Sequence, residues 1–228
     1  MRLLLRWLCL ASIAGCTLNG EGRPPVAARA SFLSHDITDG VRCAPASGLL
    51  ACLREHEPLD ARVAGIRPMR QGASLCLPLR SRTTCLVDHD GLGYALLGHA
   101  GDHLLVAETE ATGGYTVIVV DAATGLQRRV DNRPLYSGSA ELFATVSYDT
   151  DAGYLPNRVA VWKARQSTPI YQFDDFAPGE GPTGIRWLGP LKLEVRYSRA
   201  PYSPAEDGGA TFTVWRGESG VWTDDHQR

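Results

Sequence analysis

The chain has 228 residues and an almost balanced charge, with 23 Lys and Arg residues against 25 Asp and Glu residues and a formal net charge of -2. This balance predicts no surface for nucleic acid and no charge-driven affinity for anionic membranes, and we expect no nucleic-acid partner. The length is sufficient for one sizeable hydrophobic core or two small ones.

The first sixteen residues, MRLLLRWLCLASIAGC, have the layout of an export signal. Arg2 and Arg6 provide a basic start, and residues 7–15 form a short apolar run. A signal peptide has this order, and the run is about half of the ~20 residues that a membrane-spanning helix needs. The segment Ile13-Ala14-Gly15-Cys16 resembles the lipobox of bacterial lipoproteins, in which an aliphatic residue and two small residues precede a cysteine.

The lipobox resemblance implies a covalent anchor. Residues 1–15 would be removed, and Cys16 would carry diacylglycerol and a further acyl chain such as palmitate as the mature N-terminus. Thr17 rather than Asp follows the cysteine, so the outer membrane is the expected destination, with the protein on the periplasmic face. The alternative is an ordinary secretory leader that is cut after Ala14.

The next part of the chain is rich in Gly, Pro and small residues. Residues 16–30 are predicted to be the lipidated start and a flexible tether. Residues 31–228 are predicted to form a single β-rich periplasmic domain, in which residues 31–90 carry the cysteines and residues 91–228 carry a repeat. Within the first part, the pattern predicts a short helix at residues 48–57 and a short strand at residues 61–66.

The four cysteines beyond Cys16 are an even number, which in an oxidising compartment predicts two disulfides. Three connectivities are possible. We favour the pairs Cys43–Cys52 and Cys76–Cys85, since each spacing suits a local hairpin or loop. A two-residue turn at residues 80–81 would bring Cys76 opposite Cys85. Zinc ligation is the alternative, but neither pair has the CxxC spacing of a zinc site.

From about Thr83 the sequence alternates apolar strands with turns rich in Gly, Asp and Asn. The predicted strands are residues 104–109, 115–121, 126–130, 142–148, 158–164, 191–197 and 211–216. They form three similar units, which align at TVIVVDAATG, RVAVWKARQS and TFTVWRGESG. A repeat of roughly 40–55 residues resembles β-propeller blades. We therefore predict an all-β fold with short helices at most, a partial or irregular β-propeller-like domain, with a β-sandwich or barrel as the alternative.

Alternation along these strands predicts which side chains face the core. The residues expected to point inward are Val117, Val119, Val159, Val161, Leu193, Val195, Phe212 and Val214. Trp162 and Trp215 lie on the same strands as these residues, but the alternation places them on the opposite face.

Two groups of residues have side chains that bind metals. His89, His99 and His103 offer imidazoles for zinc or a similar metal, although residues 98–105 read as a turn that enters a strand rather than as a helix. Asp149 and Asp151 resemble the opening of a calcium-binding loop, but the closing glutamate is absent. Polar turn residues are the alternative explanation for both groups.

The same loop is our candidate for partner binding, through Tyr148, Tyr154 and Asn157, because aromatic residues on loops are frequent at recognition surfaces. The chain contains no GxSxG elbow and no Gly-rich phosphate loop before a helix. These patterns favour a protein-binding, inhibitor or immunity-type lipoprotein, similar in general layout to lysozyme-inhibitor lipoproteins. The alternatives are a metal-dependent envelope hydrolase and a structural subunit of an envelope complex.

Overall fold

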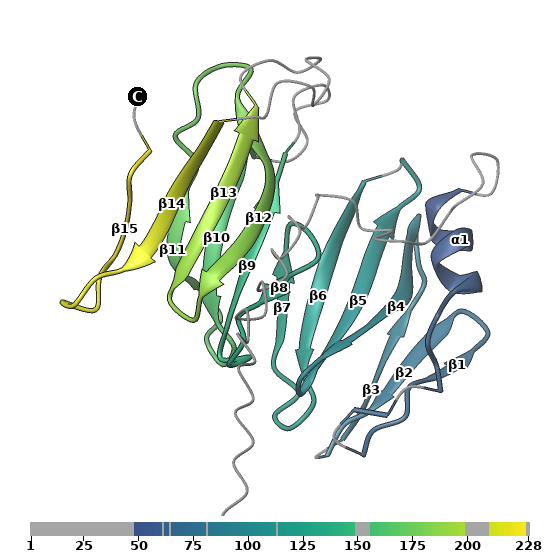
Figure 1. Cartoon of the computed structure of the whole chain (residues 1–228). Coiled ribbons are helices and arrows are strands. Elements are labelled where there is room, and N and C mark those ends of the chain that lie inside the picture. Colours follow the sequence, from purple (N-terminus) through teal and green to yellow (C-terminus); the bar gives the residue numbers. More distant parts are fainter. Residues whose placement is uncertain are drawn as a thin grey trace, which may run out of the picture.

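The computed structural model describes residues 48–60, 62–63, 65–80, 82–112, 114–148, 156–198 and 210–226. Within these ranges the chain forms one helix, α1 (Leu49–Glu55), and fifteen strands in four antiparallel sheets (Figure 1). The predicted all-β class is therefore confirmed. None of the described helical residues belongs to a helix with the length and apolar character needed to cross a membrane.

Each sheet is a meander, because its strands are hydrogen-bonded in chain order. The first sheet contains β1 (Met69–Gln71), β2 (Ser74–Pro78) and β3 (Thr83–Val87), and the second contains β4 (Leu92–Ala100), β5 (His103–Glu110), β6 (Tyr115–Asp121) and β7 (Gln127–Val130). The third contains β8 (Leu135–Tyr136), β9 (Leu142–Ser147), β10 (Arg158–Lys163) and β11 (Pro169–Phe173), and the fourth contains β12 (Gly181–Gly189), β13 (Lys192–Ser198), β14 (Ala210–Arg216) and β15 (Trp222–Asp224).

The four sheets follow one another through space in chain order and stack by their faces (Figure 1). Strand alternation produces this stacking, because successive side chains point to opposite faces of a sheet. On β6, Ile118 and Val120 face the first sheet, whereas Val117 and Val119 face the third. The two middle sheets are therefore apolar on both faces, and consecutive meanders that stack in this way have the arrangement of propeller blades.

The predicted inward-facing residues are all buried. Val117, Val119, Val159, Val161, Leu193, Val195, Phe212 and Val214 have exposed fractions between 0% and 4%. Trp162, on the opposite phase, packs between the second and third sheets, where its ring lies 5.9 Å from that of Phe143. Trp215 lies on the outer face of the fourth sheet and stays partly exposed, since no fifth sheet covers that face within the described residues.

The sequence pattern missed the first strand of each four-stranded sheet. β4 and β12 contain glycines and register shifts, one between Leu96 and Gly98 and two in β12. Such β-bulges interrupt the two-residue alternation by which strands are recognised. β8 has only two residues. The predicted strand at residues 61–66 is also wrong, because the described residues there make only an isolated bridge between Val63 and Ile66.

The predicted cross-strand disulfide is present. Cys76 and Cys85 occupy directly paired positions of β2 and β3, and their sulfur atoms are bonded. Cys52 is also disulfide-bonded, and it lies in α1. Cys43 falls outside the described residues, so the pairing Cys43–Cys52 stays a prediction.

Candidate functional site

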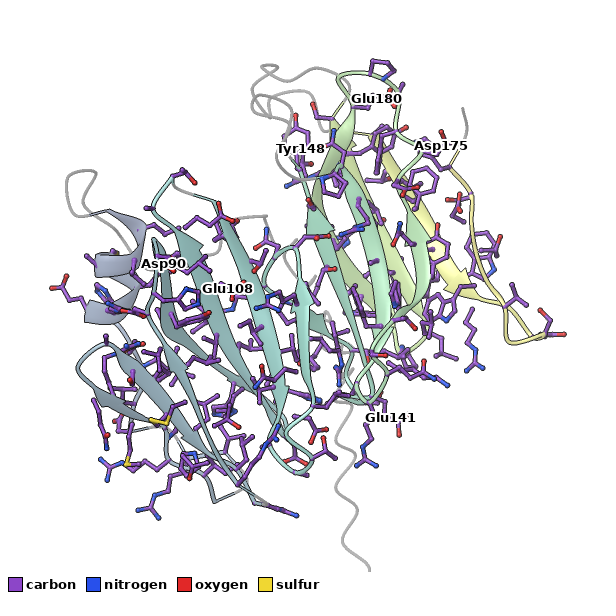
Figure 2. All side chains as sticks on the ribbon, turned by 180° about the vertical axis from the view of Figure 1, so that it is seen from behind. Asp90, Glu108, Glu141, Tyr148, Asp175 and Glu180 are labelled. Carbon is purple, nitrogen blue, oxygen red and sulfur yellow. A yellow bond between two sulfur atoms is a disulfide. The ribbon has the colours of Figure 1, made fainter. Side chains whose placement is uncertain are left out.

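Three connections leave the same edge of the third and fourth sheets, which we call the upper edge. They join β9 to β10, β11 to β12 and β13 to β14. In a meander every second connection lies at the same edge, so this placement follows from the strand order. The upper edge is at the top of Figures 1 and 2, and Tyr148, Asp175 and Glu180 are labelled there in Figure 2.

Tyr148 and Asn157 form the base of the β9–β10 connection. The Asn157 side-chain amide donates a hydrogen bond of 2.9 Å to the Glu180 carbonyl oxygen, which ties β10 to the β11–β12 connection. The Tyr148 ring lies against the backbone at Gly181. Two of the three predicted partner-binding residues are therefore at the upper edge. Tyr154, Asp149 and Asp151 lie outside the described residues.

An aromatic box lies at the upper edge, at the end of the core between the third and fourth sheets. We use this name for Phe173, Phe176, Tyr197 and Phe212, whose ring centroids lie 4.9, 5.9, 5.0 and 4.8 Å from that of His226. Both ring nitrogens of His226 are buried and have no hydrogen-bond partner within the described residues. A set of aromatic faces of this kind attracts cationic and aromatic groups.

The β11–β12 connection, which contributes Phe176 to the aromatic box, also carries three acidic side chains. Asp174 and Asp175 are exposed, and Glu180 is half-buried. Asp174 accepts a hydrogen bond of 2.9 Å from the Gln172 side-chain amide, and Glu180 accepts one of 3.3 Å from the Ala177 backbone. The upper edge therefore combines carboxylates with aromatic rings, a combination that favours a basic partner surface.

A second polar cluster is buried between the second and third sheets. His103, Asp121 and Arg128 are each at most 5% exposed. The Ala164 carbonyl oxygen accepts a hydrogen bond from Nη2 of Arg128 and lies 3.2 Å from Nε2 of His103. The Tyr136 ring stacks on His103 at a centroid distance of 5.6 Å.

Burial governs the charge states in this cluster. It lowers the pKa of His103 and of Arg128 and raises the pKa of Tyr136, since each charged form loses its hydration. Burial also acts to raise the pKa of Asp121, but hydrogen bonds from Thr124 and Ala123 outweigh it and lower this pKa. Buried atoms of His103, Arg128 and Tyr136 have no partner within the described residues, and this arrangement suits internal water.

The three histidines predicted as metal ligands do not converge. His89 lies beside Leu92 at the start of β4, whereas His99 lies near its other end. His99 is exposed and pairs with Leu104, while His103 is buried and pairs with Ala100, so the two imidazoles lie on opposite faces of the hairpin. Across the part of the chain that the structure describes, no three His, Cys, Asp or Glu residues are grouped closely enough to share a metal ion.

Sequence reasoning identified part of this edge. It placed Tyr148 and Asn157 there, whereas Phe173 and Tyr197 of the aromatic box lie in strands β11 and β13. The position of His226 in the aromatic box had no sequence signal, because it depends on the pairing of β15 with β14. The buried cluster around Arg128 had none either, because it requires two sheets to meet.

No protein-family model matches the chain, and no curated protein matches it in sequence. The function proposed below therefore rests on the geometry of the described residues.

Proposed function

We propose that the protein is a lipid-anchored envelope module that binds a protein partner in the periplasm, as an inhibitor or immunity-type protein does, through the upper edge of its third and fourth sheets. The observation that carries this proposal is that the described ends of β9, β10, β13 and β14 and the β11–β12 connection lie at that edge together with the aromatic box. Binding residues lie disproportionately on loops held by a rigid scaffold.

The chemistry of the upper edge favours a basic partner. Buried aromatic side chains supply most of the binding energy at many interfaces, and Phe173 and Phe176 remain only partly buried here. The carboxylates of Asp174, Asp175 and Glu180 add a local negative field. Such a field accelerates association with a cationic surface and opposes association with an anionic one.

The lipobox supports the envelope location. An acylated Cys16 followed by a tether would keep the domain at the membrane while leaving the sheets free to meet a soluble partner. An inhibitor or immunity protein benefits from this arrangement because it intercepts its target where the target acts.

Site-specific photo-cross-linking in the native host tests the proposal. A photoreactive amino acid replaces Asp175 at the upper edge or Glu141, which is exposed at the opposite edge (Figure 2). We expect position 175 to give an adduct with one protein of basic surface, and position 141 to give no such adduct. Equal adducts from both positions, or none from position 175, would contradict the proposal.

A further inference from the structure

The lower edge of the fourth sheet, opposite the upper edge, exposes apolar side chains on two neighbouring turns. Leu188 and Leu191, at the β12–β13 turn, are 48% and 42% exposed, and Val221, in the β14–β15 turn, is 64% exposed. The two turns are joined by a hydrogen bond of 3.0 Å from the Arg216 backbone to the Leu191 carbonyl oxygen. Arg216 also donates from Nε to the Gly220 carbonyl oxygen at 2.9 Å, which holds the second turn in place.

Two grooves meet beside these turns. The first has a volume of about 500 Å³ and is lined by Leu191, Lys192 and Trp215, among others. The second has a volume of about 340 Å³ and is lined by Lys163, Val221 and Trp222, among others. Arg216 lines both grooves, so it lies between them.

Cationic side chains frame the exposed apolar residues. Lys163 and Lys192 are the only lysines of the chain, and both are exposed at this surface together with Arg216. Three acidic groups lie nearby: Asp225 accepts a hydrogen bond from the Thr213 backbone, Glu218 lies in the β14–β15 turn, and the exposed Glu141 is next to Leu142, the strand partner of Lys163. Lys163, Lys192 and Arg216 lie on three different strands, β10, β13 and β14, so their placement at this edge depends on the folded structure.

We propose that this lower surface, defined by Leu188, Leu191, Val221, Lys163, Lys192 and Arg216, docks on an anionic bilayer. Leucine and valine side chains on turn tips enter the region between headgroups and acyl chains, while ammonium and guanidinium groups bind lipid phosphates. The indoles of Trp215 and Trp222 beside them suit the same interface, where Trp is enriched. Apolar side chains on projecting turns suit a soft lipid surface, whereas a protein interface has its apolar residues in a closely packed centre.

The inference rests on the proposed function in one respect, because a lipid anchor keeps the domain beside a membrane. It also adds to that function. The lower and upper edges lie at opposite ends of the same strands, so docking through the lower edge turns the upper edge away from the bilayer (Figures 1 and 2). The partner-binding loops would then face the periplasm.

Depth measurements on vesicles test the docking. The full-length chain carrying Cys16→Ser removes acylation as a cause of binding, and an environment-sensitive fluorescent amino acid replaces Val221 or, as the matched control, Asp175. With vesicles that contain phosphatidylglycerol, we expect brominated lipids to quench the label at position 221 and not the label at position 175. Any association through the leader would affect both labels alike.

Charge variants test the role of the lysines. The double variant Lys163→Gln with Lys192→Gln should bind these vesicles about 25-fold more weakly, at roughly fivefold for each cation. Lys163→Arg with Lys192→Arg should bind like the parent. Unquenched labels at both positions, or equal binding by both double variants, would overturn the proposal.

A protein partner on the lower surface is the competing result. It would appear as a cross-linked protein from position 221 in cells, together with no quenching on vesicles. Failure of docking while position 175 still cross-links its partner would refute only this inference. Docking without any adduct from position 175 would refute only the proposed partner binding.

Discussion

The Tyr148 ring lies directly on the backbone of Gly181, so closely that a Cβ atom at position 181 would be 2.2 Å from Cδ2 of the ring. Tyr148 directly follows β9 of the third sheet, and Gly181 begins β12 in the fourth. This contact, together with the hydrogen bond from Asn157 to Glu180, joins the two sheets at the upper edge. The absence of a side chain at position 181 therefore determines how the proposed binding edge is assembled.

Gly181→Ala should consequently destabilise the fold by about 1–3 kcal/mol, because the added methyl group displaces the tyrosine ring. Gly189→Ala is the matched control in the same strand, since a Cβ there meets no atom within 4 Å. Urea unfolding of both variants provides the comparison. Equal stability of the two variants would show that the Tyr148 contact does not constrain the edge.

The disulfide between Cys76 and Cys85 should stabilise the first sheet, which has only three strands. Replacing both cysteines by serine should lower the free energy of unfolding by about 2–3 kcal/mol, because the closed loop is short. The double replacement avoids a free thiol, which would be able to exchange with the disulfide of Cys52. Denaturant unfolding measures the loss, and a variant as stable as the parent would contradict the expectation.

Acid should destabilise the protein through His103. Burial lowers the pKa of this histidine in the folded state, so the unfolded chain binds its proton more readily. The stability that depends on the neutral imidazole is present above the unfolded pKa of about 6.5 and is lost as the pH falls through the folded pKa. Unfolding free energies between pH 7 and 5 should decrease in the parent, and the slope should be smaller in His103→Gln. An unchanged slope would refute the role of His103.

Arg128 and Arg158 should respond differently to replacement by methionine. Arg128 is buried, and its Nε and Nη1 atoms have no partner within the described residues, so Arg128→Met should leave the stability unchanged or increase it. Arg158 forms an ion pair with Asp131, with Nε 2.8 Å from one carboxylate oxygen. Arg158→Met should therefore lower the stability by about 1 kcal/mol, with the partial exposure of the pair limiting the effect. Thermal unfolding distinguishes the two variants, and a greater loss in Arg128→Met would contradict this account.

Lipidation at Cys16 is testable by metabolic labelling. If residues 13–16 act as a lipidation signal, labelled palmitate should be incorporated into the parent chain and not into Cys16→Ser. The variant should also move from the membrane fraction to the soluble periplasm. Ala14→Asp, which disturbs both leader types, serves as the processing control. Unlabelled parent protein that is cut after Ala14 would establish the secretory alternative.

The local pattern of the sequence was sufficient for the features that depend on neighbouring residues. The strands β6, β10 and β14, with buried residues such as Val119, Val161 and Val214, follow from short apolar runs rich in β-branched residues and bounded by turn residues. The Cys76–Cys85 pair follows from a short hairpin, whose register is set by its turn. β4 and β12 escaped prediction because bulges and glycines interrupt the same alternation.

The candidate site depended on tertiary structure, because contacts between sheets leave no periodic trace in the chain. His99 and His103 have a spacing that suits one face of a helix, but the hairpin turns them to opposite faces. His226 reaches the aromatic box only through the pairing of β15 with β14. The net charge predicted no affinity for anionic membranes, but folding places Lys163 and Lys192 in two grooves that share Arg216. Composition and local pattern determined the class of fold and about half of the described strands, whereas the stacking of the sheets decided which side chains meet, because that stacking joins residues far apart in the sequence.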